Sequence, residues 1–302
     1  MPSRLDEFIA RLKRGEMLLG DGAWGTQLQH LGLEFGACPE EWNVTQPEKV
    51  RGIARSYLEA GADFCLTNTF GANRYRLTRH GFADRLMDFN RAGVQLSLEA
   101  AEPFKSAVVL ASIGPTGEFV QPEGMLSAAE MRAAFREQAD ILKAAGVDAV
   151  LVETMYVPEE AALAVEAAKQ AGLFCMACIT FDATPNGFKT MLGAGIREAV
   201  GALEQAQADV IGSNCGNGIE QMAAIAKAMR ACTSKPLMIK SNAGLPTLQN
   251  GKAVYDETPE SMARWLPELR ASGVSIAGGC CGSTPDHIRA FRSVINVMNS
   301  GK

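Results

Sequence analysis

The stretch AAGVDAVLVET, residues 144–154, carries one complete unit of the pattern that decides the fold. A helical segment ends at Gly146, because glycine accepts the left-handed conformation with which many helices close. The apolar run 149–152 follows and is typical of a parallel strand that is covered on both faces. Glu153 and Thr154 stand where this strand ends. The stretch therefore predicts a helix, a glycine stop, a buried strand and a polar loop.

The same order of elements recurs along the whole chain, with equivalent glycine stops at Gly61 and Gly273. Strands are predicted at residues 17–19, 64–67, 108–112, 149–152, 174–180, 210–212, 237–240 and 274–277. Helices are predicted at residues 47–60, 83–104, 127–145, 158–171, 197–207, 219–232, 258–272 and 285–299. Eight β/α units predict a (β/α)8 barrel of the TIM type, as a single domain over residues 1–302. A doubly wound open sheet is the alternative, but the glycine fingerprint for phosphate that such sheets usually carry does not follow the first strand.

The composition is that of an ordinary globular protein, with 47% hydrophobic and 21% charged residues. A formal net charge of -5 gives no support for nucleic acid or an anionic membrane surface as a partner. The first sixteen residues lack the apolar core of a signal peptide, and no apolar run approaches the length of a membrane span. We therefore expect a cytoplasmic protein whose eight cysteines are thiols or metal ligands.

Three cysteines stand directly after predicted strands. Cys280 and Cys281 are adjacent in GGCCG, residues 278–282, and Cys215 lies in GSNCG, residues 212–216. The strands that precede them are near neighbours in a closed barrel, so the three thiolates could meet one ion. Three thiolates with one open position are typical of a catalytic zinc site, and the open position suits a substrate that is itself a thiol. The alternatives are a structural zinc site, which would need a fourth protein ligand, or small buried apolar side chains.

The remaining cysteines predict packing and not chemistry. Cys175 and Cys178 imitate a metal-binding CxxC motif, but they lie in a predicted strand. A spacing of three places their side chains on opposite faces of that strand, so they cannot chelate one ion together. The same interpretation as packing or surface residues applies to Cys38, Cys65, Cys232, His30, His80 and His287.

Polar groups follow several of the predicted strands and should meet at one end of the barrel, where the active sites of such folds lie. Asp21 and Glu153 are carboxylates that could bind a substrate ammonium, although Asp21 could equally cap loop amides. The backbone N–H groups of Gly22 and Ala23 could hold a substrate carboxylate. Groups that bind a cation and an anion, next to a zinc ion that binds a thiolate, suit an amino acid with a thiol side chain as the substrate.

These motifs resemble those of the homocysteine S-methyltransferase family over nearly the whole chain. The resemblance rests on DGA (21–23), TNTFGA (67–72), ET (153–154), NC (214–215) and GGCCG (278–282). It implies a (β/α)8 barrel with zinc on Cys215, Cys280 and Cys281, which we also take as the catalytic residues. It implies further that Asp21 and Glu153 hold the homocysteine ammonium and that the Gly22–Ala23 backbone helps to hold its carboxylate.

Two stretches are most similar to the homocysteine module of cobalamin-dependent methionine synthase: TNTFGA, which contains Asn68, and NAGLP (242–246), which begins with Asn242. We add both asparagines to the expected substrate-binding residues. Trp24 departs from this branch, which usually has a smaller side chain there. The chain also contains no Asp-x-His-x-x-Gly corrinoid motif.

The resemblance implies an enzyme that transfers a methyl group to the thiol of L-homocysteine with the help of Zn²⁺ and so gives methionine. The expected donor is a methylated corrinoid on a separate protein, or a small onium compound such as S-methylmethionine, S-adenosylmethionine, betaine or dimethylsulfoniopropionate. Trp24, Trp42, Tyr75 and Tyr156 could form a cation–π cage for an onium donor or be ordinary loop packing. Thr154 argues against betaine, because the betaine branch has tyrosine there. A non-catalytic homocysteine-binding subunit, or a methyltransferase for a different thiol, are the alternatives.

Overall fold

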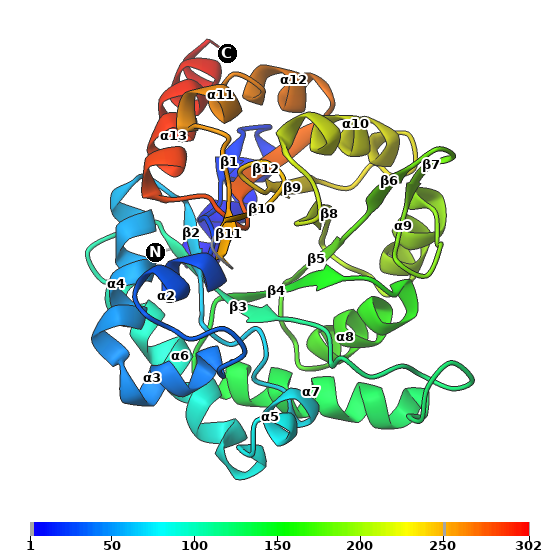
Figure 1. The fold of residues 1–302 in the computed structure, drawn as a ribbon. Helices are drawn as coiled ribbons and strands as arrows, with labels where there is room; N and C mark the ends of the chain where they lie inside the picture. The colour runs from blue at the N-terminus through cyan, green and yellow to red at the C-terminus, as the bar shows by residue number, and fades with distance from the viewer. Residues whose placement is uncertain (1–2, 250–251, 302) are drawn as a thin grey trace.

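The computed structural model describes residues 3–249 and 252–301, which form an eight-stranded barrel surrounded by helices (Figure 1). All paired neighbours in this sheet run parallel. The predicted (β/α)8 architecture is therefore confirmed. In sheet order the strands are β1 (Leu18–Leu19), β12 (Val274–Gly279), β9 (Leu237–Ser241), β8 (Val210–Asn214), β5 (Cys175–Ile179), β4 (Ala149–Met155), β3 (Val108–Ile113) and β2 (Phe64–Leu66).

The barrel closes at the seam between β1 and β2, where two aspartates supplement the backbone. The Asp63 N–H donates to the carbonyl oxygen of Leu19 at 2.7 Å, and the Leu19 N–H donates to Asp63 Oδ2 at 2.7 Å. Further along the seam, the Leu66 N–H donates to Asp21 Oδ2 at 2.8 Å. Buried backbone donors must find acceptors. The two carboxylates supply them at a seam that the two-residue β1 cannot pair alone.

The outer layer consists of the helices that follow the strands, and their bounds lie close to those predicted. They are α4 (Pro47–Glu59), α6 (Leu86–Ala101), α7 (Ala128–Ala144), α8 (Pro158–Gln170), α9 (Ile196–Gln205), α10 (Ile219–Arg230), α11 (Pro259–Ala263), α12 (Leu266–Ala271) and α13 (Pro285–Ser300). The single helix predicted at 258–272 was wrong, because the structure has two helices there. Pro267 stands in the first turn of α12, a position that proline tolerates, whereas it would break a continuous helix.

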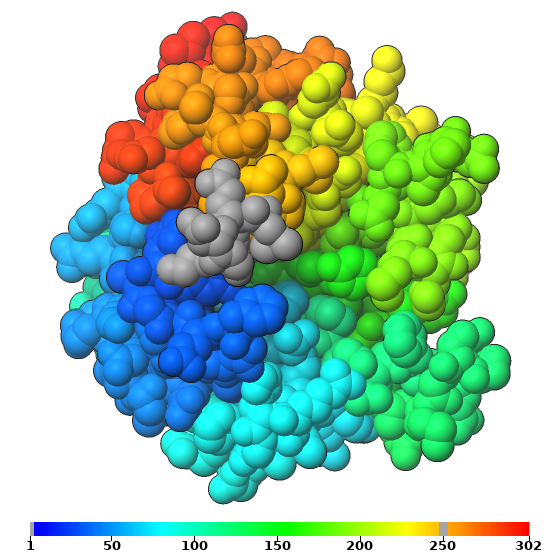
Figure 2. All heavy atoms as spheres, viewed as in Figure 1, coloured from blue at the N-terminus to red at the C-terminus, as the bar shows by residue number. Residues whose placement is uncertain are grey.

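Several short elements were not predicted, and most of them lie in the loops that follow the strands. They are α2 (Gly25–His30), η1 (Pro39–Glu41), α3 (Trp42–Thr45), α5 (Arg74–Arg79) and the hairpins β6–β7 (Asp182–Thr184, Gly187–Lys189) and β10–β11 (Thr247–Gln249, Lys252–Val254). The start of the helix predicted at 83–104 is a separate 3-10 turn, η2 (Ala83–Arg85), directly before α6. Figure 2 shows the molecule from the end at which these loops gather, and the N-terminal segments in blue lie there beside the C-terminal segments in orange and red. None of the helices in the described residues has the length and apolar character needed to cross a membrane.

The buried side chains form an inner and an outer layer, which the two cysteines of β5 illustrate. Cys178 belongs to the cluster inside the barrel, with Met176 and Val210, whereas Cys175 belongs to the layer between the strands and the helices. Both thiols are fully covered, and burial raises the pKa of each. The prediction that these two cysteines face opposite sides of one strand and serve packing is confirmed.

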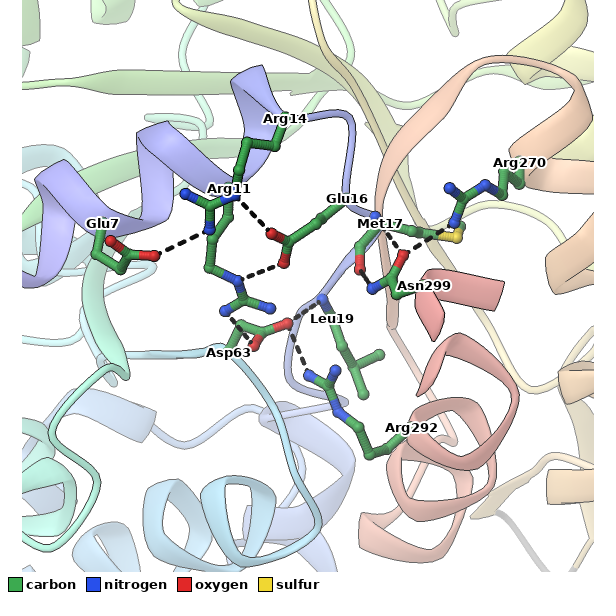
Figure 3. Close-up of polar contacts among 10 residues, drawn as sticks. All are labelled: Glu7, Arg11, Arg14, Glu16, Met17, Leu19, Asp63, Arg270, Arg292 and Asn299. Carbon is green, nitrogen blue, oxygen red and sulfur yellow. Dashed lines mark hydrogen bonds and ion pairs between the residues drawn. The ribbon is translucent and has the colours of Figure 1, made fainter. Parts of the chain in front are cut away.

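The N-terminal end of the barrel is covered by α1 (Arg4–Lys13), an amphipathic helix that the sequence analysis did not predict. Phe8 of this helix is 1% exposed and packs edge-on against Phe64 inside the barrel, with ring centroids 6.1 Å apart. Ion pairs fix the helix in place (Figure 3): Asp63 accepts from Arg11 at 2.8 Å and from Arg292 of α13 at 2.7 Å. The first helix, the seam and the last helix are thereby joined at one carboxylate.

Candidate metal centre and substrate site

The three candidate metal ligands meet at the end of the barrel opposite α1. Cys215 directly follows β8, and Cys280 and Cys281 directly follow β12. The strand between them, β9, anchors both loops: the Cys215 N–H donates to the Lys240 carbonyl at 3.1 Å and the Cys280 N–H to the Ser241 carbonyl at 2.7 Å. The three Sγ atoms lie within 4.8 Å of one another. The structure thus brings together the residues that the sequence predicted, and β9 determines their spacing.

The backbone at the thiols is specialised. Cys215 adopts φ 62°, a left-handed conformation that a non-glycine residue holds only when its surroundings enforce it. Gly282, with φ 81°, follows the cysteine pair, and a Cβ atom there would come within 2.2 Å of the Tyr255 ring. Only glycine therefore allows Tyr255 to pack against the turn that carries Cys280 and Cys281.

The donor set fits a thiophilic divalent cation. A tetrahedral zinc ion with Zn–S bonds of roughly 2.3 Å separates its sulfurs by about 3.8 Å. The Sγ atoms of Cys215 and Cys281 are 3.8 Å apart. The hydrogen bond with Cys215, together with burial, raises the pKa of Cys280 well above its usual value. A bound cation would have to displace the protons from these thiols, as metals do at thiolate sites.

Two tyrosines stand beside the thiols, and only one of them was anticipated. Burial, followed by the charge of Cys215, raises the pKa of Tyr156 to about 12, which places this ring near the cluster. Tyr255 was missed: its hydroxyl hydrogen-bonds to Cys281. It follows β11 of a hairpin that the sequence did not predict, and no motif in the sequence identified it. Hydrogen bonds to ligand sulfurs commonly orient and tune metal sites.

Glu153 ends the buried run of β4 and points a carboxylate into this site. It is 7% exposed, and it accepts from Ser112 Oγ at 2.6 Å and from Asn214 Nδ2 at 3.2 Å. Burial raises the pKa of this carboxyl group. Asn214 also accepts from the Thr154 N–H at 2.8 Å, and its Nδ2 lies 3.8 Å from Cys280 Sγ. One asparagine therefore connects the carboxylate at the end of β4 with the thiols.

Asp21 is completely buried and is already in an ion pair. Its Oδ1 accepts from Lys240 Nζ at 2.7 Å, and its Oδ2 accepts from Trp24 Nε1 and from the Leu66 N–H, each at 2.8 Å. Burial lowers the pKa of Lys240, but Asp21 and Glu153 outweigh this effect, and the pKa is raised. Sequence reasoning missed Lys240. A lysine near the end of an otherwise apolar, buried strand is the signal that could have identified it.

The other expected substrate residues lie in the loops at the same end of the barrel. The Ala23 N–H donates to Ser283 Oγ at 3.1 Å, and Gly22 packs against the Tyr57 ring. Asn68 donates to the Pro39 carbonyl at 2.8 Å and thereby holds the loop after β1. Asn242 is 4% exposed, and its Oδ1 has no hydrogen-bond partner among the residues the structure describes. Asn242 is therefore the residue of this group with a free buried acceptor.

The aromatic residues proposed for a cation–π cage do not form one group. Trp24 turns its indole N–H to Asp21, and Tyr156 lies near the thiols. Trp42, however, already has a cation over its ring, because Lys49 Nζ lies 4.5 Å from the ring centroid. The histidines are structural or exposed, as expected: His287 contacts Thr284 and the Glu257 carbonyl, and His30 and His80 are exposed.

Comparison with known proteins gives a family and a fold. The sequence profile of the family described as Homocysteine S-methyltransferase matches residues 18–295. A methionine synthase of Mycobacterium leprae is 35% identical over an alignment of 303 positions that covers 94% of this chain and 25% of that protein. A methionine synthase of Mycobacterium tuberculosis is 34% identical over an alignment of 299 positions that covers 92% of this chain and 24% of that protein. The chain thus spans about a quarter of the length of these relatives.

Solved structures show the same barrel. The homocysteine methyltransferase MmuM from Escherichia coli, in its metallated form, superposes with a TM-score of 0.78 at 23% identity and covers 94% of this chain and 98% of its own. Its oxidised form gives a TM-score of 0.77 at 24% identity, with 95% and 98% covered. At this identity the likeness establishes the fold.

Proposed function

We propose that this chain, which belongs to the homocysteine S-methyltransferase family, transfers a methyl group to the thiol of L-homocysteine and so produces methionine. The observation that carries this proposal is the cluster of Cys215, Cys280 and Cys281, with Sγ atoms within 4.8 Å of one another, beside the buried carboxylate of Glu153. Three thiolates at the open end of a barrel would hold Zn²⁺ with one position left for a fourth ligand. The adjacent carboxylate provides the charge that an amino-acid ammonium requires.

Zinc, when bound, would lower the pKa of the substrate thiol so that its sulfur is a thiolate at neutral pH. The protein's own residues hold this sulfur in reach of the donor and fix the rest of the amino acid. Glu153 would receive the ammonium, and Asn214 holds Glu153 in place. The substrate sulfur then forms a bond to the methyl carbon, and the bond between that carbon and the donor breaks, its electron pair leaving with the donor.

The remaining expected residues keep a proposed role in holding the substrate. Asn242 contributes a buried oxygen that a polar group of the substrate could satisfy. The Gly22–Ala23 backbone and Asn68 line the same end, and Ser283 and Pro39 already occupy part of their hydrogen-bonding capacity. We place the reaction in the cytoplasm, since free thiols at positions 215, 280 and 281 need a reducing compartment.

For the methyl donor we propose first a methylated corrinoid carried by a separate protein. The support is the likeness to methionine synthases of which this chain spans about a quarter. Exposed apolar side chains in two loops at this end, Phe35 after α2 and Leu245 after β9, also suit contact with a large partner. A small onium donor is the second candidate, favoured by the position of Trp24 and Tyr156 at the site.

The test is a methyl-transfer assay with zinc-loaded protein, L-homocysteine and one donor at a time. The donors are methylcobalamin, S-methylmethionine, S-adenosylmethionine, betaine and dimethylsulfoniopropionate. We expect methionine with at least one of them and none with Cys281→Ala. Binding of homocysteine without transfer from any donor would favour a non-catalytic homocysteine-binding subunit. Transfer to another thiol in preference to homocysteine would identify a different acceptor.

A further inference from the structure

We infer that Lys240 decides which carboxylate of the site receives the substrate ammonium. Lys240 occupies Asp21, so that Glu153 alone remains to bind the ammonium, and Lys240 is a positioning residue for the choice of acceptor. This inference rests on the proposed function, because it concerns the amino group of the thiol substrate. It narrows the expectation that Asp21 and Glu153 share this role.

The geometry separates the two carboxylates clearly. Lys240 is 1% exposed and Asp21 is 0% exposed, and their charged atoms are 2.7 Å apart. Because the other Asp21 oxygen accepts from Trp24 Nε1 and the Leu66 N–H, Asp21 has an ion pair and two further donors. Among the described residues, Glu153 accepts hydrogen bonds only from the neutral groups of Ser112 and Asn214. No ion pair of Glu153 occurs within residues 3–249 and 252–301.

The charges point in the same direction. Asp21, Glu153 and Lys240 together carry a net charge of about -1 when all three are ionised. A substrate ammonium next to Asp21 would lie beside the Lys240 ammonium, and like charges in a buried site repel strongly. The Lys240 charge also acts on Glu153, but from a longer distance, because among the described residues its direct ion pair is with Asp21. A substrate ammonium next to Glu153 would therefore pair with the carboxylate that has no direct ion pair. A buried carboxylate without a partner is costly, so Glu153 gains more from the substrate than Asp21 does.

Lys240 would therefore act without touching the substrate. It lies under the site, at the end of β9, with its Nζ atom also 5.8 Å from the Phe64 ring centroid. By neutralising Asp21, it makes the site a receiver for one ammonium and not for two. The acceptor class that fits is a thiol with a single amino group at one end, as in homocysteine.

The test compares two thiols that differ in the amino group. Isothermal titration calorimetry with the zinc-loaded full chain gives the dissociation constants of L-homocysteine and of 4-mercaptobutyrate, and their ratio measures ammonium recognition. We expect Glu153→Gln to reduce the preference for homocysteine at least tenfold. We expect the double variant Asp21→Asn/Lys240→Met, which removes both members of the ion pair, to weaken both thiols together and to keep the preference within about threefold. Lys240→Met alone frees a second carboxylate and should increase the preference.

Failure of the inference and failure of the proposed function would give different results. If the double variant lost the preference for homocysteine while Glu153→Gln kept it, the ammonium would be assigned to Asp21. That result would overturn the inference. Failure of wild-type protein to bind either thiol would instead remove the proposed function and the inference with it. A crystal structure of the zinc-loaded wild type with homocysteine tests the same point without a substitution. It should show the ammonium on Glu153 and Lys240 still on Asp21, and an ammonium on Asp21 with Lys240 displaced would contradict us.

Discussion

Asn214 donates its side-chain amide to Glu153 Oε2 at 3.2 Å, so the residue that precedes one candidate metal ligand holds the candidate ammonium receiver. The same amide reaches Thr154 Oγ1 at 2.9 Å, and Thr154, like Cys215, is in the left-handed region, with φ 58°. Two unusual backbone conformations at the ends of β4 and β8 are therefore tied together by one side chain. Sites supported in this way by rigid strands hold their geometry better than sites on loops alone.

Purified protein should contain about one Zn²⁺ per chain, because three thiolates and one open position form a complete zinc site. Cys215→Ala, Cys280→Ala and Cys281→Ala should each lose most of the metal, measured by elemental analysis. Cys175→Ala is the matched control, since that thiol is buried in the outer packing layer. Loss of zinc in the control with retention in Cys281→Ala would show that the ligands are assigned wrongly.

X-ray absorption should detect the open position directly. The zinc-loaded protein should show three sulfur neighbours and one lighter ligand, and addition of L-homocysteine should change this to four sulfurs. Four sulfurs before any thiol is added would mean that the zinc is structural and that the proposed chemistry does not occur there.

Glu153→Gln should weaken homocysteine binding by about 1–3 kcal/mol, the range for hydrogen bonds to charged groups. The substitution keeps size and hydrogen bonding but removes the charge that attracts the ammonium. Zinc content should be normal, because Glu153 is not part of the cluster of candidate metal ligands. Calorimetry with 4-mercaptobutyrate provides the control, and an equal loss for both thiols would mean that Glu153 shapes the site and does not bind the amino group.

The preference for homocysteine over 4-mercaptobutyrate should fall as the pH is lowered. The midpoint of this fall should lie at a higher pH than the usual pKa of a glutamate side chain. Burial raises the pKa of Glu153, so its carboxylate takes up a proton earlier on acidification and loses its charge. The charged groups that face it, Lys240 and Asp21, act on it in opposite directions. Using a ratio of two thiols cancels effects of pH on the metal. A preference that declines equally in Glu153→Gln would exclude Glu153 as the titrating group.

Asp63→Asn should lower the free energy of unfolding by about 1–3 kcal/mol, measured by chemical denaturation. The reason is that the charged hydrogen bonds from Arg11 and Arg292 would both be weakened or lost by this one substitution. Its side chain is only 11% exposed. Glu59→Gln is the control: Glu59 pairs with Arg55, but both side chains are more than half exposed, and such pairs contribute little. Equal stability of the two variants would mean that the network at the base of the barrel does not support the fold.

The parts of the molecule that could be predicted from the sequence are those set by periodicity and local stops. The glycine stop and the apolar run that follows it, as at Gly146, recur along the chain. This pattern predicted eight strands and the main helices. The cysteines after β8 and β12 were predicted to meet because strand ends in a parallel barrel share one end. Their actual spacing depends on hydrogen bonds to β9 carbonyls, which no local pattern encodes.

What the sequence could not provide depends on partners that are distant in the chain. Tyr255 reaches Cys281 from a hairpin with no repeat and no motif. Lys240 reads as the polar end of a strand until the fold places Asp21 beside it. The split between α11 and α12 could have been predicted, because Pro267 stands inside the range that was predicted as one helix.

The helix across the base of the barrel has a consequence for the order of events during turnover. Phe8 fills the N-terminal end of the barrel and apolar side chains fill its interior, so in the part of the chain that the structure describes the thiols face the loop end. If the proposed transfer takes place there, acceptor, donor and both products would enter and leave at that same end. A donor large enough to cover that end would trap an acceptor already inside and exclude one still outside. For such a donor the barrel would impose an order of binding, in which the acceptor binds before the donor and the methylated acceptor leaves after the donor dissociates.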